Sequence, residues 1–185
     1  MPRRVVLSEE ITDMRALQAW MFRAGPNLLR EIVPDAAKGQ PYEVVWRHRG
    51  ATVHFIDDTI AKENYFAFTA HFPELEARLH ADFETFDPAA LIAASAPSPA
   101  ERGRQAVRVG LIADCEERRD AAFDLLRERL ADASAEVRLA ALLGVSYTSA
   151  RAWAPQVATL AAEDPDAGVR EEAARVVEAL RAHGS

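Results

Sequence analysis

A repeated segment constrains this sequence more than any other feature. The stretch Asp132–Thr148 is followed, 32 residues later, by a related stretch, Asp164–Leu180, and six of the seventeen aligned positions are identical. The identical pairs are Asp132/Asp164, Ala135/Ala167, Val137/Val169, Arg138/Arg170, Ala141/Ala173 and Val145/Val177. A segment that recurs at such a spacing is typical of repeat architectures, in which each copy is one supersecondary unit.

The apolar residues of each copy follow the period of a helix. Val137, Ala141, Gly144 and Val145 lie at i, i+4, i+7 and i+8, so they form one stripe on a helix. The preceding segments also correspond at an offset of 32, which makes a helix pair the repeating unit; the matched residues are Ala122/Ala154, Leu125/Val157 and Leu130/Ala162. A weaker third copy, Ala106–Ala113, has Arg102 where the later copies have their aspartate.

The pattern Asp-x-x-x-x-Val-Arg-x-x-Ala resembles the signature of short bacterial HEAT-like repeats. It is present as Asp132 to Ala141 and again as Asp164 to Ala173. The resemblance implies that residues 87–185 form an α-helical HEAT-like solenoid of about three helix pairs. It also implies an extended surface for protein–protein interaction.

We expect the repeated polar residues to be structural. Asp132 and Asp164 fall at turns between helices, where a carboxylate accepts hydrogen bonds from unpaired amide groups. Arg138 and Arg170 each carry a rigid fork of donors that suits a carboxylate or carbonyl of a neighbouring unit. We therefore predict that Arg138 pairs with the turn at Asp164.

Residues 1–86 predict a small α+β region that contains a β-hairpin. A turn at Arg49-Gly50 would join a strand ending at His48 to a strand over Ala51–Asp57, with Trp46 opposite Val53 and Val44 opposite Phe55. The further elements expected here are a third strand at Asn64–Ala70, a fourth at Phe83–Phe86, and helices at Glu9–Arg23, Asn27–Val33 and Phe72–Ala81. The fold class is thus α+β and mainly α, with a three- to four-stranded antiparallel sheet.

Residues from Asp87 onward predict helices joined by short turns. Ser98 and Glu101 form a capping box, S-x-x-E, with a proline at the first helical position. Further helices are expected at Glu116–Ala131, Ala135–Tyr147, Ala150–Ala162 and Asp166–Ala182. Gaps this short leave antiparallel neighbours as the natural arrangement.

The charge balance disfavours two classes of partner. The chain has a net charge of −7 and a sequence pI of about 5.3. Nucleic acids and anionic membranes attract basic surfaces, and no apolar run reaches the length of a membrane span, so we expect neither partner. The only cysteine is Cys115, which predicts a cytoplasmic setting.

Few residues suggest catalysis or cofactor chemistry. The five histidines form no zinc-binding pattern and no glycine-rich phosphate loop is present, so we expect neither metal nor cofactor. Asp57, Asp58 and Glu63 offer paired carboxylates in a polar loop, for acid–base chemistry or a hard metal ion, with a solvated hairpin loop as the alternative. Because loops often carry function, Asp57 and Asp58 are also candidates for partner binding. Tyr147 and Trp153 are candidates for partner binding, with packing between repeats as the alternative.

Three functional hypotheses remain open at this stage. The first is a non-enzymatic adaptor that binds another protein through its HEAT-like repeats. The second is a HEAT-like enzyme of the bilin-lyase or base-excision type, although residues 88–185 carry 12 Lys and Arg against 15 Asp and Glu, which disfavours DNA. The third is an immunity or regulatory protein that binds one basic partner. Self-association through a sheet edge or the terminal repeat is a further alternative.

Overall fold

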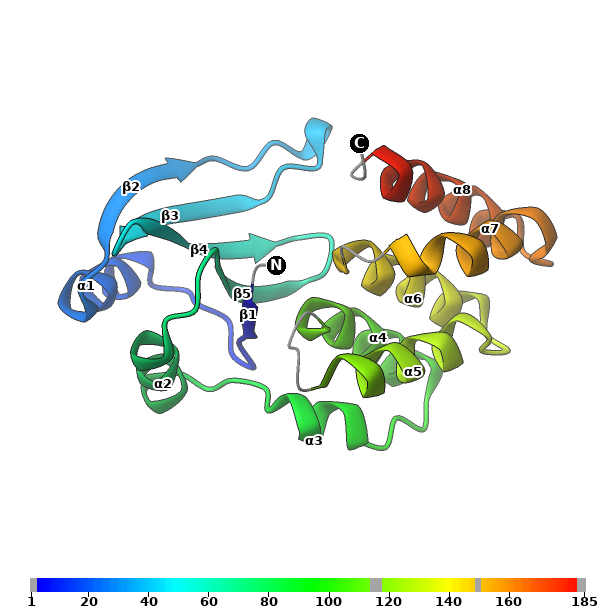
Figure 1. The fold of residues 1–185 in the computed structure, drawn as a ribbon, viewed down its shortest axis with the longest axis horizontal. Coiled ribbons are helices and arrows are strands. Elements are labelled where there is room, and N and C mark those ends of the chain that lie inside the picture. Colours follow the sequence, from blue (N-terminus) through cyan, green and yellow to red (C-terminus); the bar gives the residue numbers. More distant parts are fainter. Residues whose placement is uncertain (1–2, 114–117, 149–150, 183–185) are drawn as a thin grey trace. The chain divides into compact units, whose positions relative to one another are not determined.

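The chain is divided into two structural units, with the boundary after Asp87 (Figure 1). The computed structural model describes residues 3–113, 118–148 and 151–182. Met1–Asp87 is an α+β unit, and Pro88–Ser185 is a helical unit. Within the described ranges, no helix is long and apolar enough to cross a membrane.

The first unit is built on a five-stranded antiparallel sheet with the order β1-β5-β4-β3-β2. The strands are β1 Arg3–Val6, β2 Asn27–Ile32, β3 Tyr42–His48, β4 Ala51–Asp58 and β5 Glu63–Phe68. The sheet therefore has more strands than the three or four predicted. The sequence indicates no strand at β1 and predicts a helix at β2. These two strands form the edges of the sheet.

The predicted hairpin and its register are confirmed. Trp46 lies opposite Val53 and Val44 lies opposite Phe55, and these side chains are almost completely buried. The two turn residues between β3 and β4 have positive φ, 47° at Arg49 and 86° at Gly50. Positive φ at both central residues is what the right-handed twist of a two-residue hairpin requires.

The predicted helix at Asn27–Val33 is wrong, because this segment is the edge strand β2. Its apolar residues are spaced as on a helix, yet Leu28 and Leu29 are largely exposed, at 55% and 45%. The register shifts between Leu28 and Arg30, which marks a bulge. Pairing with the neighbouring strand β3 thus overrides the local pattern.

Two other element predictions need correction. The helix expected from Glu9 begins at Met14, because the carboxylate of Asp13 accepts hydrogen bonds from the amides of Arg15 and Ala16 and caps the helix there. The strand expected at Phe83–Phe86 is reduced to a single bridge between Leu7 and Thr85.

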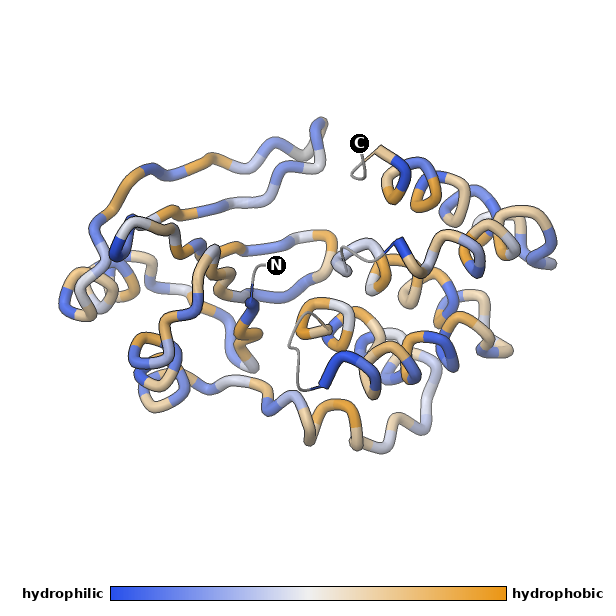
Figure 2. Tube along the Cα trace, viewed as in Figure 1, coloured by the Kyte–Doolittle hydropathy of each residue, from blue (hydrophilic) through white to orange (hydrophobic). Residues whose placement is uncertain are grey.

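Helices α1 (Met14–Ala24) and α2 (Pro73–Asp82) pack their apolar residues into one core with the sheet. Figure 2 shows hydrophobic residues recurring along the strands and helices that form this core. Its members from the helices and the central strands are Leu17, Trp20, Met21, Leu75, Leu79, Val44, Trp46, Val53, Phe55, Phe66 and Phe68.

The second unit contains, in its described part, the helices α3 to α8. Their bounds are α3 Pro88–Ala93, α4 Pro99–Ile112, α5 Arg119–Leu130, α6 Ala135–Tyr147, α7 Ala154–Glu163 and α8 Ala167–Ala182, with a 3-10 turn at Arg151–Trp153. The bounds of α6 and the capping box of Ser98 and Glu101 are confirmed. The predicted starts of two helices at Glu116 and Ala150, and Cys115, lie outside the described residues.

Helices α4, α6 and α8 follow one another in the second unit (Figure 1), with α4 packed on α6 and α6 on α8. The contact between α4 and α6 passes through two glycines. A Cβ added at Gly110 would lie 2.2 Å from the carbonyl oxygen of Gly144, and one added at Gly144 would lie 2.5 Å from that of Ala106. The two backbones therefore touch at a distance that only glycine permits.

We predict that Gly110→Ala and Gly144→Ala each lower the free energy of unfolding by about 2–3 kcal/mol, because the added methyl group meets rigid backbone. Gly168→Ala is the matched control, since Gly168 is exposed at the start of α8 and its added Cβ meets only the Asp166 side chain. The control should be neutral or slightly stabilising. Urea denaturation measures all three, and equal stability of the three variants would contradict the prediction.

Candidate functional site

The two repeat turns have the same geometry around their aspartates. Asp132 Oδ1 accepts a hydrogen bond from the amide of Ser134 at 2.9 Å. Asp164 Oδ1 accepts one from the amide of Asp166, also at 2.9 Å. Each carboxylate thus satisfies an amide that the following helix leaves unpaired.

The two repeat arginines also make matching contacts. Arg138 Nη1 donates to the carbonyl oxygens of Asp132 and Ala133, at 2.8 and 3.2 Å. Arg170 Nη1 donates to the equivalent carbonyls of Asp164 and Pro165, at 2.6 and 3.2 Å. The contacts of each arginine with the carbonyls of its own turn are therefore repeated in the structure.

The predicted pairing of Arg138 with Asp164 is confirmed. Nε and Nη2 of Arg138 each donate to one carboxylate oxygen of Asp164 at 2.8 Å, so the pair is bidentate. Both side chains are buried, with 9% and 2% exposed. The hydrogen bonds from Arg138 lower the pKa of Asp164 despite this burial. The pair joins one helix pair to the turn of the next.

Asp132 receives an arginine from a position that the sequence analysis did not assign. Arg102 Nε and Nη2 donate to its two carboxylate oxygens, at 2.6 and 3.2 Å. These bonds lower the pKa of Asp132. Arg102 stands where the later copies carry their aspartate, so an apparent departure from the repeat was the signal for this contact. Arg102 therefore links the first copy to the second.

Trp153 lies inside the helical unit, with 2% of its surface exposed. Its ring centroid is 4.9 Å from that of Phe123 on α5, and the guanidinium of Arg127 lies 5.7 Å from the ring. Tyr147 at the end of α6 is half-buried. For Trp153 this geometry favours packing between repeats over direct contact with a partner.

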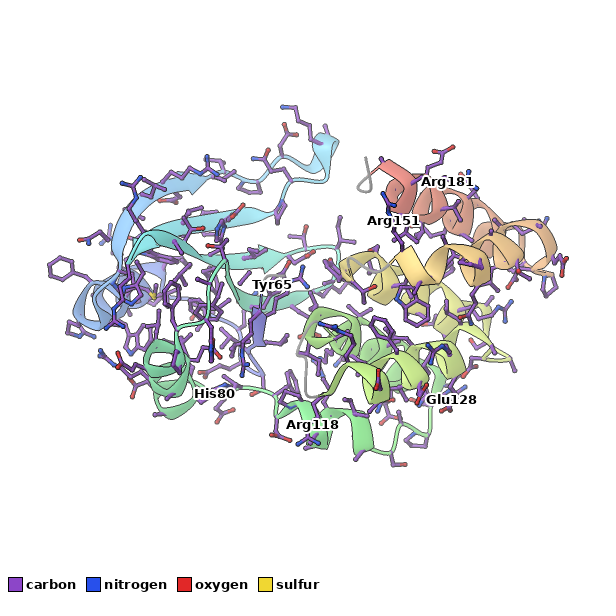
Figure 3. The ribbon with its side chains drawn as sticks, in the orientation of Figure 1. Tyr65, His80, Arg118, Glu128, Arg151 and Arg181 are labelled. Atoms are coloured by element: carbon purple, nitrogen blue, oxygen red, sulfur yellow. The ribbon has the colours of Figure 1, made fainter. Side chains whose placement is uncertain are left out.

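Asp57 and Asp58 are adjacent on β4, so their side chains leave opposite faces of the strand. Asp58 is buried, and its carboxylate accepts hydrogen bonds from the amides of Ile60 and Ala61 and from the hydroxyl of Tyr65, which is labelled in Figure 3. Burial and the negative charge of Asp58 raise the pKa of Tyr65. Asp57 instead accepts a hydrogen bond from Asn64. The structure thus does not bring the two carboxylates together as an acid–base pair.

One histidine belongs to a polar chain that the sequence analysis missed. His54 Nε2 lies 2.7 Å from the Thr52 hydroxyl, and its Nδ1 is hydrogen-bonded to Glu43 on the neighbouring strand. His48 and His54 lie on opposite faces of the hairpin, since His54 pairs with Val45 while His48 contacts the core residue Phe72. Among the described residues, no group of three or more His, Cys, Asp or Glu could hold a metal ion.

No protein-family model, curated protein or solved structure matches this chain. The fold itself defines the class of protein: an antiparallel sheet unit followed by a unit of stacked helices with duplicated turns.

We predict that Arg138→Ala and Asp164→Ala each cost about 3–5 kcal/mol of stability, because each leaves a buried charge without its partner. The double variant should cost less than the sum of the two, with a coupling of about 1–3 kcal/mol. Additive losses in urea denaturation would contradict the pairing.

Because folding lowers the pKa of Asp164, the contribution of Asp164 to stability is present at neutral pH and is lost as the pH falls through the folded pKa. Asp164→Asn should therefore flatten the acid limb of the stability curve.

We also predict different roles for the two carboxylates of β4. Asp58→Ala should lower the free energy of unfolding by about 1–3 kcal/mol, because it leaves buried donors in the turn without an acceptor. Asp57→Ala, the matched control, removes a single half-buried hydrogen bond and should cost about 1 kcal/mol or less. Chemical denaturation compares them, and a larger loss for Asp57→Ala would reverse the assignment.

Proposed function

We propose that residues 88–185 form a short HEAT-like repeat stack and that the protein is a non-enzymatic adaptor for one other protein. The observation that carries the proposal is the duplicated turn, in which Asp132 and Asp164 make the same contacts in successive helix pairs. A helix pair cannot bury its apolar stripe alone, so stacked pairs share one core and present their outer residues as a continuous surface.

The residues that the repeats share are used for stacking. Val137, Ala141, Val145 and their equivalents Val169, Ala173 and Val177 are all buried. Two positions that differ between the copies are more accessible: half-buried Leu139 and Ala140 in α6 correspond to exposed Glu171 and half-buried Glu172 in α8. Variable outer positions on a constant core are the feature that repeat proteins use to select a partner.

The charge of these outer positions supports a basic partner. Glu171 and Glu178 are both exposed on α8, seven residues apart and therefore on one face of the helix, with Glu171 ion-paired to the exposed Arg175 at 2.7 Å. The whole chain carries a net charge of −7, which favours association with positively charged surfaces. A regulatory or immunity role would be a special case of this proposal. The single cysteine supports a cytoplasmic setting.

Self-association through the sheet edge is a weaker alternative. Edge strand β2 exposes Leu28 and Leu29, which would favour pairing with a second copy. The same strand contains a bulge and the charged residues Arg30 and Glu31, which are features that protect sheet edges from pairing.

The proposal is tested by affinity capture from the source organism with the wild-type chain and two variants of equal charge change. Glu171→Lys combined with Glu178→Lys replaces the two exposed acids of α8 by bases and should abolish recovery of the partner. The control reverses Glu10 and Glu84, two exposed acids of the first unit, and should retain the partner. Reconstitution of the purified pair by calorimetry then gives the affinity. Equal capture by both variants would exclude α8, and loss of capture by the control alone would contradict the proposal.

A further inference from the structure

A cavity of about 160 Å³ lies in the first unit, where the β3–β4 hairpin meets the start of α2. Four of its lining side chains can carry a positive charge and one carries a negative charge. They are His48, Arg49, His71 and Arg78, with Glu74 as the single acid. This volume is smaller than that of pockets for drug-sized ligands, so it suits a small ion or the terminal group of a larger ligand.

The lining of this cavity is positively charged, whereas the unit around it is acidic. Residues 1–87 contain 10 Lys and Arg against 14 Asp and Glu, so the unit as a whole is acidic. The cavity nevertheless brings together two of those arginines with only one carboxylate. Local positive charge in an acidic unit raises the concentration of small anions at that place.

The backbone of Arg49 supports a role for its side chain. Arg49 has a φ of 47° in the hairpin turn, a conformation in which asparagine, aspartate or glycine is ordinarily found. Its guanidinium Nη2 lies 3.0 Å from Glu74 Oε2, yet both side chains are mostly exposed, at 67% and 78%. An exposed ion pair of this kind contributes little stability, so it does not account for an arginine at a strained position.

Two of the other cationic side chains, His48 and Arg78, contact aromatic rings. His48 packs edge-on against Phe72 with ring centroids 4.8 Å apart. The guanidinium of Arg78 lies 5.8 Å from the centroid of the Trp20 ring. Burial and the charge of Arg49 lower the pKa of His48, while Glu74 acts in the opposite direction. An anion in the cavity would stabilise the protonated ring.

We propose that this cavity is a binding site for a phosphoryl group, either free phosphate or the end of a small phosphate monoester, held by Arg49 and Arg78 with His48 and His71 beside them. A guanidinium presents paired donors that match the oxygens of a phosphoryl group. The bound group competes with Glu74 for Arg49. This inference is independent of the adaptor function, because it concerns the other unit.

The test is an NMR titration of the histidine ring signals of the full chain at constant ionic strength. Inorganic phosphate and O-phosphoserine are the two phosphoryl probes, and acetate is the control anion. Phosphate should cause saturable shifts of His48 and His71, with a Kd on the order of 1 mM, and should raise the pKa of His48. Tighter binding of O-phosphoserine would assign the site to monoesters, and tighter binding of phosphate would assign it to the free ion.

Arg49→Asn is the decisive variant, because asparagine tolerates positive φ while the guanidinium is lost. It should keep or raise the melting temperature and weaken phosphate binding about tenfold. Lys62→Asn is the matched control, since Lys62 also has a positive φ, 56°, and lies outside the cavity lining. This control should retain binding.

Glu74→Gln should act in the opposite direction and tighten phosphate binding severalfold, because it removes the competing carboxylate. Three outcomes would overturn the proposal: shifts that do not saturate by 50 mM phosphate (about fifty times the expected Kd), acetate binding as tightly as phosphate, or unchanged affinity in Arg49→Asn.

Discussion

The helical unit depends on the buried ion pair between Arg138 and Asp164, which joins successive helix pairs. The guanidinium of Arg138 donates hydrogen bonds in two directions. Nε and Nη2 bind the carboxylate of Asp164, and Nη1 binds the carbonyls of its own turn. A buried guanidinium requires this number of acceptors, because charge removed from water must be compensated by nearby polar groups. The pair therefore sets the spacing between two turns as well as their charge balance.

Close backbone contact complements this polar link. Gly110 and Gly144 let α4 and α6 approach until carbonyl groups stand where side chains would otherwise lie. Apolar packing alone would tolerate several helix spacings, whereas backbone contact and a bidentate ion pair each accept a narrow range. Together they explain how a short stack of helix pairs holds one arrangement, with its outer positions free to vary.

The first unit is held together by apolar packing between its sheet and its helices. Its hairpin carries the aromatic and branched residues that fill the core, and α1 and α2 contribute the remaining apolar side chains. The hairpin turn also places Arg49 beside the cavity at the start of α2. The features that we connect with binding thus lie on turns and outer positions, while the core residues serve packing.

Local periodicity and turn chemistry are sufficient to predict several features of this fold. These are the hairpin with Trp46 opposite Val53, the limits of α6, and the link from Arg138 to Asp164, since each follows from alternation, helical stripes or a repeated motif. Tertiary structure alone decided that Asn27–Ile32 is a strand, because pairing with β3 outweighs a helical spacing of leucines. It also decided the partner of Arg102 and the gathering of His48, Arg49 and Arg78 around one cavity. Such contacts join residues far apart in the chain, and no local pattern specifies them.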